Sequence, residues 1–285
     1  MIVDFHTHTF PEALADKAIP NMAAAARIQP YLRGTPDQLL ASMKQAGIGV
    51  SVVLPVATNV RQPRKLNDLA ARQNEAFSGT GLVSFGAMHP DDPNWKSELR
   101  FLGAHGFRGI KLHPMYQNVP FDDIRTLRIL EEASSLGLLI TVHAGMDVGI
   151  PGPALASPAA IYRAQRETGA SGIIAAHMGG WKMWQEVKEV LAGAPVYLDT
   201  SFSFGRMHYS GEYPRTEEEL LQGDTALLTE IIRLHGADRV LFGSDSPWGS
   251  EEQELSVIRS LDLSPKEIGK ITGGNAERLL GLSED

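Results

Sequence analysis

The sequence contains no cysteine among its 285 residues. Disulfides, thiolate metal ligands and cysteine nucleophiles are therefore excluded, so any bound metal must use histidine, carboxylate or a modified lysine. No stretch approaches the ~18 consecutive apolar residues of a membrane-spanning helix. Lysine and arginine total 26 against 34 acidic residues, a net charge of −8 without a basic cluster, which argues against a nucleic-acid partner.

The remaining composition is that of an ordinary globular chain, with 43% hydrophobic and 21% charged residues. The first ten residues place Asp4, His6 and His8 where a secretory signal would have basic and then apolar residues, so we expect a cytoplasmic protein. The partner that we expect is a small-molecule substrate, on the strength of the strand-end residues described below and not of the composition. The composition does not decide between a monomer and a homo-oligomer.

Short, mostly continuous apolar runs alternate with segments of helical spacing along the whole chain. Continuous apolar runs are typical of parallel strands that are covered on both faces. Helical stripes are predicted over residues 39–46, 124–133 and 184–191, the first of them introduced by the capping sequence Thr35-Pro36-Asp37. Eight strands are predicted over residues 1–5, 49–54, 82–87, 107–112, 138–142, 172–176, 195–198 and 239–242.

This alternation favours an α/β fold with a parallel sheet. Because no G-x-G-x-x-G motif follows the first strand, a closed (β/α)8 TIM barrel is preferred to an open dinucleotide-binding sheet. No linker is apparent, so we predict one domain over residues 1–285. Long segments leave the strands at residues 9–34, 113–122, 144–157 and 200–224, as expected for the active-site face of a barrel.

Histidines gather at the ends of the predicted strands. His6 and His8 are two residues apart, so both rings project from the same side of an extended strand. Asp4 would share that side and orient a ligand histidine through its second ring nitrogen. Such a set suits zinc or a similar divalent ion, although a His-x-His pair alone also occurs at polar strand ends. The other strand-end residues are His89, His113, His143 and His177, with Asp245 after the eighth strand; His89 is interpreted as structural.

Five motifs together resemble the amidohydrolase superfamily, and within it the "amidohydrolase 2" branch of metal-dependent hydrolases and aminocarboxymuconate-semialdehyde decarboxylase-like enzymes. The resemblance extends from the first strand to the last helix and is carried by the combination rather than by any single motif. The motifs are Asp4-Phe5-His6-Thr7-His8, Thr141-Val142-His143-Ala144-Gly145, Ala176-His177-Met178-Gly179-Gly180, the run Phe242-Gly243-Ser244-Asp245-Ser246-Pro247-Trp248, and residues 271–282.

The resemblance implies a metal centre and roles for the residues around it. His6, His8, His143 and Asp245 match the ligands of a mononuclear site. His177 matches a histidine that either polarises substrate and moves protons or binds a second metal. Zinc is the expected ion, as one ion or as two bridged by carboxylated Lys111. The other interpretation of Lys111 is a side chain that lies along the barrel rim with its ammonium in solvent.

The leading hypothesis is metal-assisted hydrolysis of an amide, lactone or related carboxyl-derived bond. Asp245 would transfer the proton, His177 and Lys111 would complete the catalytic set, and His113 and Arg206 would contact the substrate. A metal-dependent, non-oxidative decarboxylase of a small carboxylic acid fits the same residues. A catalytically inactive binding barrel is the third hypothesis, which the retention of every ligand type argues against.

Overall fold

The computed structural model describes residues 1–209 and 222–282, and their short strands all run parallel. Two hydrogen-bonded runs, β1-β2-β3 and β4 to β9, follow the order of the chain around the molecule. The strands are β1 (Val3–Thr7), β2 (Val50–Val53), β3 (Leu82–Ser84), β4 (Gly86–Ala87), β5 (Gly109–Leu112), β6 (Leu139–Val142), β7 (Ile173–Ala175), β8 (Tyr197–Asp199) and β9 (Val240–Leu241).

The first and last strands meet and close the sheet into a barrel. The backbone N–H of Phe5 donates to the carbonyl of Phe242 at 2.8 Å, and Thr7 pairs with Ser246 in a parallel bridge. The single strand predicted over residues 82–87 is divided into β3 and β4 at Phe85, whose N–H still bonds to the Val53 carbonyl at 2.9 Å. Apart from this division, the predicted (β/α)8 barrel is confirmed.

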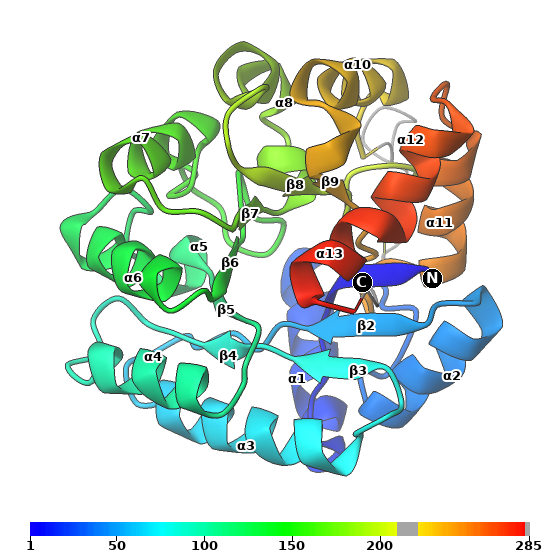
Figure 1. Cartoon of the computed structure of the whole chain (residues 1–285). Coiled ribbons are helices and arrows are strands. Elements are labelled where there is room, and N and C mark those ends of the chain that lie inside the picture. The colour runs from blue at the N-terminus through cyan, green and yellow to red at the C-terminus, as the bar shows by residue number, and fades with distance from the viewer. Residues whose placement is uncertain (210–221, 283–285) are drawn as a thin grey trace.

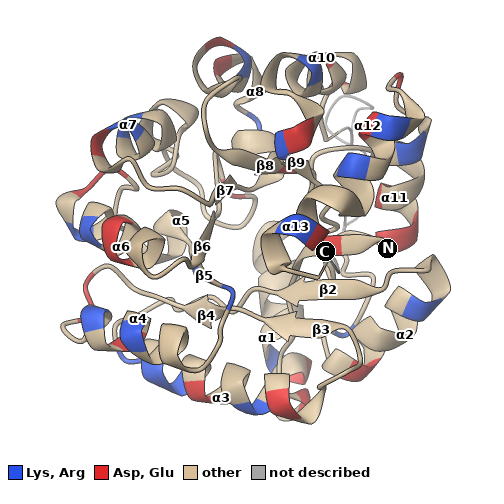
Figure 2. Cartoon of the chain, viewed as in Figure 1, with Lys and Arg blue, Asp and Glu red and all other residues tan. Residues whose placement is uncertain are grey.

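Helices surround the barrel, and Figure 1 shows them as a ring around the strands, with α13 in front. Figure 2 shows basic and acidic residues interspersed on the outer helices. No helix among the described residues has the length and apolar character needed to cross a membrane. The α-helices are α1 (Glu12–Ala26), α2 (Pro36–Ala46), α3 (Pro63–Ala76), α4 (Trp95–Ala104), α5 (Pro114–Gln117), α6 (Ile124–Ser135), α7 (Pro158–Thr168), α8 (Trp184–Glu186), α10 (Thr225–His235), α11 (Glu251–Ser260), α12 (Pro265–Gly269) and α13 (Asn275–Leu280), and shorter turns are η1 (His177–Gly179), η2 (Val187–Leu191), η3 (Ala237–Arg239) and η4 (Lys270–Gly274).

The predicted helix boundaries follow from ordinary capping chemistry. Thr35 accepts a hydrogen bond from the N–H of Gln38, and Pro36 occupies the first turn of α2. The same helix ends at Gly47, which adopts a left-handed φ of 73° and donates its N–H to Met43. These local signals are independent of tertiary packing, so the sequence could place α2 correctly.

Helix α1 lies in the segment 9–34, where no helical stripe was predicted. Only Ala15 and Ile19 are buried in it, and Pro20 lies inside the helix. A helix that buries only two residues has no continuous buried apolar face, which explains why periodicity did not reveal it. In Figure 1, α1 lies behind the barrel, on the side where the strands end.

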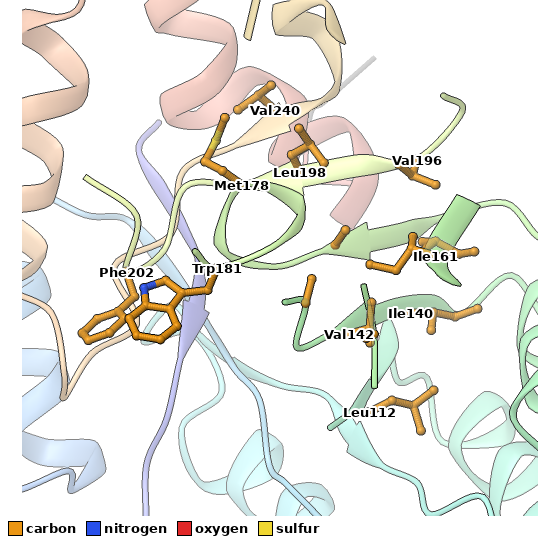
Figure 3. Packing of buried hydrophobic residues seen from close by; sticks show 14 of the residues in the cluster. Leu112, Ile140, Val142, Ile161, Met178, Trp181, Val196, Leu198, Phe202 and Val240 are labelled. Carbon is orange, nitrogen blue, oxygen red and sulfur yellow. The ribbon is translucent and has the colours of Figure 1, made fainter. Parts of the chain in front are cut away.

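Two apolar layers hold the barrel together. The outer layer packs strand residues against the ring of helices, and Figure 3 shows Ile140 of β6 and Ile161 of α7 among its members. The inner layer fills the barrel with Val3, Phe5, Phe85 and other strand residues, and Leu280 of α13 covers it where the strands begin. The opposite end of the barrel is therefore the end that remains open for a site.

Candidate metal centre

A cavity of about 310 Å³ opens at the ends of the strands. His89 lies outside it and accepts a hydrogen bond from the N–H of Asp91, as expected for a structural residue. Arg206 is exposed and is not among the residues that line the cavity, so a role for it in substrate binding stays a prediction. The cavity is lined by the other seven predicted site residues, His6, His8, Lys111, His113, His143, His177 and Asp245.

His6, His8 and Asp245 converge on one point of this cavity. Nε2 of His6 lies 3.4 Å from Oδ1 of Asp245, and Nε2 of His8 lies 3.2 Å from the same oxygen. The three ligand atoms lie within 4.8 Å of one another. The first strand and the end of the last strand bring these atoms together, because β1 is paired to the segment that carries Asp245 through the Asp245 N–H and the His6 carbonyl at 2.8 Å.

The hydrogen bonds of the two rings fix which nitrogen carries the proton. Nδ1 of His6 lies 2.9 Å from Asp199 Oδ2, and Nδ1 of His8 lies 2.8 Å from the Leu54 carbonyl. Both partners only accept, so Nδ1 carries the proton in each neutral ring and Nε2 presents a lone pair. These lone pairs face an ionised carboxylate oxygen, an arrangement that a cation between them would stabilise. The donor set therefore fits a divalent metal ion.

Burial disfavours the charged form of His6 and of His177, and the neutral ring is the form that binds metal. Burial and the nearby charge of Lys111 hold the pKa of His6 well below its usual range. Burial and His143 do the same for the pKa of His177. For Asp245, burial raises the pKa, but the hydrogen bond with His8 and the charges of His6 and His177 outweigh it and leave the pKa below its usual range.

His143 and His177 lie beside this point, with one ring nitrogen of each facing the other. Nε2 of His177 is 3.0 Å from Nδ1 of His143, and Nδ1 of His177 is 3.0 Å from the Ser201 carbonyl. Nε2 of His143 is 3.0 Å from the Met146 carbonyl. Neither nitrogen of His143 thus faces Asp245 directly, and its role as a metal ligand stays a prediction.

Lys111 is buried inside the barrel, with 1% of its surface exposed. Its Nζ lies 3.1 Å from Nε2 of His6, so the interpretation that the side chain lies along the rim with its ammonium in solvent is wrong. Burial lowers the pKa of Lys111 to about 8, although Asp199 and Asp245 oppose the shift. A lysine with this pKa is a mixture of ammonium and neutral amine near neutral pH.

His113 forms the opposite wall of the site together with the loop after β6. Its ring stacks on His143 with centroids 4.1 Å apart, and its Nε2 lies 3.5 Å from Oδ2 of Asp147. Burial and His143 hold the pKa of His113 well below its usual range. Asp147, which the sequence interpretation did not single out, gives this wall its one carboxylate among the described lining residues outside the His6–His8–Asp245 group.

The residue that orients His6 is Asp199 rather than Asp4. The Asp4 carboxylate accepts hydrogen bonds from the backbone of His6 and from Ser244, and the pairing of β1 with β2 changes register between Asp4 and Thr7. Such an irregularity breaks the strict alternation of side chains on which the prediction for Asp4 depended. Asp199 ends β8, so the strand-end criterion that selected the histidines could have found it.

Two of these residues adopt left-handed backbone conformations. His177 has φ 57° and Asp245 has φ 62°, a region that costs a non-glycine residue about 1–3 kcal/mol. The His177 N–H donates to Asp199 Oδ1 at 3.1 Å, and the Asp245 N–H donates to the His6 carbonyl. The strained turns therefore direct the side chains of His177 and Asp245 into the cavity. Hydrogen bonds from their backbone N–H groups to Asp199 and to the His6 carbonyl stabilise these turns.

A family model described as amidohydrolase matches residues 3–282. No curated protein matches the chain. Among solved structures, a 2,6-dihydroxybenzoate decarboxylase in complex with 2,6-dihydroxybenzoate is similar with a TM-score of 0.71 and 20% identity, covering 98% of this chain and 99% of that chain. These figures describe a shared fold.

Two further solved structures are similar along their whole length. A dihydroxybenzoic acid decarboxylase from Polaromonas sp. with bound manganese and the inhibitor 2-nitroresorcinol has a TM-score of 0.68 and 17% identity, covering 100% of this chain and 98% of that chain. A putative 2-pyrone-4,6-dicarboxylic acid hydrolase from Pseudomonas putida has a TM-score of 0.65 and 18% identity, with the same two coverages.

Proposed function

Because this chain belongs to the amidohydrolase family, we propose that it is a metal-dependent hydrolase whose His6, His8 and Asp245 hold a divalent cation. Support comes from one observation above all: the Nε2 lone pairs of both histidines face the same Asp245 oxygen, 3.4 and 3.2 Å away. Two imidazoles and a carboxylate suit zinc, and the similar Polaromonas decarboxylase binds manganese. We propose zinc, held as a single ion.

A divalent ion bound there supplies a Lewis acid that polarises a carbonyl and makes water a better nucleophile near neutral pH. Asp245 is ionised and lies at the same point, so it accepts a proton from the attacking water. The water oxygen forms a bond to the substrate carbonyl carbon. The bond from that carbon to the leaving nitrogen or oxygen then breaks, and Asp245 returns the proton to the leaving atom.

Lys111 is the group that meets the negative charge developing on the carbonyl oxygen. Its ammonium is buried and lies 3.1 Å from His6 Nε2, in a site where an electrostatic contact is weakly screened. His177 was the first candidate for this role. Its Nδ1 proton is directed at the Ser201 carbonyl, however, and its Nε2 lies 3.0 Å from Nδ1 of His143, so neutral His177 has no ring proton left to direct at a substrate oxygen.

A metal measurement tests the centre itself. Wild-type protein purified without chelator should retain about one divalent ion per chain, and His8→Ala should lose most of it, because the substitution removes one of three converging donors. Equal metal in the two proteins would remove His8 from the site. Two ions per chain, with a second ion that depends on added bicarbonate, would instead favour the bridged centre with carboxylated Lys111.

Decarboxylation is the second candidate, and the same Lys111 favours it. A buried ammonium beside the proposed cation would pair with a substrate carboxylate and could supply the proton that replaces carbon dioxide. Purified protein supplied with zinc or manganese should be assayed against lactones, amides and dihydroxybenzoic acids. Incorporation of oxygen from labelled water supports hydrolysis, whereas carbon dioxide release without such incorporation overturns it.

A further inference from the structure

One part of the cavity is not used by the reaction proposed above. From the metal centre the cavity continues between helices α1 and α3, and the Gln73 side chain of α3 donates to Thr9 Oγ1, just before α1, at 3.1 Å. Leu14 and Met22 of α1 and Leu66 and Leu69 of α3 line this part. We call it the α1–α3 arm.

The α1–α3 arm offers no cationic side chain that would pair with an anionic group. Among the described residues that line the cavity there is no arginine, and the one lysine, Lys111, is at the metal centre. Two polar side chains of the arm bond within the protein, since Gln62 accepts from the N–H of Thr58 at 2.6 Å and Gln73 donates to Thr9. The hydroxyl of Ser84, which also lines the cavity, is buried and has no hydrogen-bond partner among the described residues. A carboxylate placed there would lose its hydration without gaining a cationic partner.

The apolar surface of the cavity is also incompletely covered by the protein. Leu14 is 50% exposed and Met146 is 42% exposed, although both line the cavity. Few large apolar side chains are this exposed among the described residues, and two of them flank one cavity that also holds the metal ligands. An apolar group of a ligand would cover them and gain the free energy of removing that surface from water.

We infer that the substrate carries an uncharged apolar group, a hydrocarbon chain or an unsubstituted ring, which occupies the α1–α3 arm while the carbonyl to be cleaved lies at the metal centre. This substrate class rests on the proposed hydrolase function, since that function places the reacting carbonyl. The arm itself would select the apolar group whatever the reaction.

The binding test uses straight-chain hydroxamic acids, from acetohydroxamic to octanohydroxamic acid, measured by calorimetry on zinc-loaded protein. Affinity should rise about threefold to fourfold for each added methylene until the arm is filled. A matched ligand of the octanoyl length that ends in a carboxylate should bind at least tenfold more weakly than octanohydroxamic acid. Equal affinity along the series, or no binding by any member, would overturn the inference.

A pair of exposed leucines provides matched variants. Leu14→Gln changes a residue of the arm, whereas Leu234→Gln changes a leucine of similar exposure, 53%, on α10 outside the cavity. Leu14→Gln should flatten the dependence on chain length, and Leu234→Gln should leave it unchanged. Identical behaviour of the two variants would contradict the placement of the apolar group.

Turnover separates this inference from the proposed function. A chain-length dependence of hydroxamate binding without hydrolysis of any alkyl-substituted lactone or amide would reject the hydrolase and keep the arm. Hydrolysis whose kcat/KM is the same for methyl- and hexyl-substituted lactones would keep the hydrolase and reject the arm.

Discussion

The two ends of the barrel are built from the same strands and differ almost completely in chemistry. Where the strands begin, Phe5 and Phe85 meet edge to face with centroids 5.8 Å apart, and Leu280 of α13 covers them. Where the strands end, His6 and Asp245 line a cavity whose wall also includes the buried imidazoles of His143 and His177. One end is filled by the protein itself, and the other is left for a ligand.

Strand β1 contributes to both ends through adjacent residues. Phe5 belongs to the apolar filling, and the next residue, His6, faces Asp199, Lys111 and Asp245. Strict alternation would send two neighbours to opposite sides of a strand, and the register change between Asp4 and Thr7 removes that restriction. The local irregularity therefore allows one short strand to contribute to both the apolar core and the site. We expect that a substitution at one end of the barrel can impair activity or stability without impairing the other.

The largest separate effect is expected from Asp245→Asn at the open end. The amide keeps the shape of the carboxylate but cannot accept a proton from water, so kcat should fall by about 10²–10⁴-fold. The free energy of unfolding of metal-free protein in urea should fall far less than activity does, since strand pairing uses the Asp245 backbone. A variant that unfolds at much lower urea, with a matching loss of activity, would show that the two ends are not separable.

A smaller effect, on stability alone, is expected from Leu280→Ala at the filled end. Leu280 is 1% exposed, and removing a buried leucine side chain should lower the free energy of unfolding by about 2–5 kcal/mol. Metal content and kcat per folded molecule should remain those of the wild type at low temperature. The matched control is Leu234→Ala on α10, where the 53% exposed side chain should contribute less than about 0.5 kcal/mol. Loss of metal from Leu280→Ala would contradict the conclusion that the two ends of the barrel can be altered separately.

The fold could be predicted because its signals are local or periodic. Buried parallel strands give continuous apolar runs, and helix ends such as Thr35 and Gly47 carry their own capping chemistry. Helix α1 has neither signal, since it buries only Ala15 and Ile19. Its position is decided by contacts beyond the strand ends, which periodicity does not report.

The sequence could predict which residues of the candidate site lie close together, but not which of them contact one another. The barrel requires strand ends to meet at one rim, so His6, His8, Lys111 and Asp245 had to lie near one another. Which carboxylate holds His6 depends on the register change in β1, and that is a property of the paired strands rather than of the sequence pattern.

The smallest of the three effects would sharpen this last point. Asp199→Asn keeps an oxygen that can accept from His6 Nδ1, but it removes the negative charge that favours the bound cation. It also places the amide NH2 group at the position of Oδ1, which accepts from the backbone N–H groups of His177 and Ser201. Metal affinity should fall by about 10–100-fold, as is typical when the partner of a ligand histidine is changed. Asp4→Asn is the matched control, because Asp4 is equally buried but bonds to Ser244 and to backbone instead of to a ring. Zinc titration against a competing chelator measures both variants, and a larger loss in Asp4→Asn would return to Asp4 the orienting role that its sequence position first suggested.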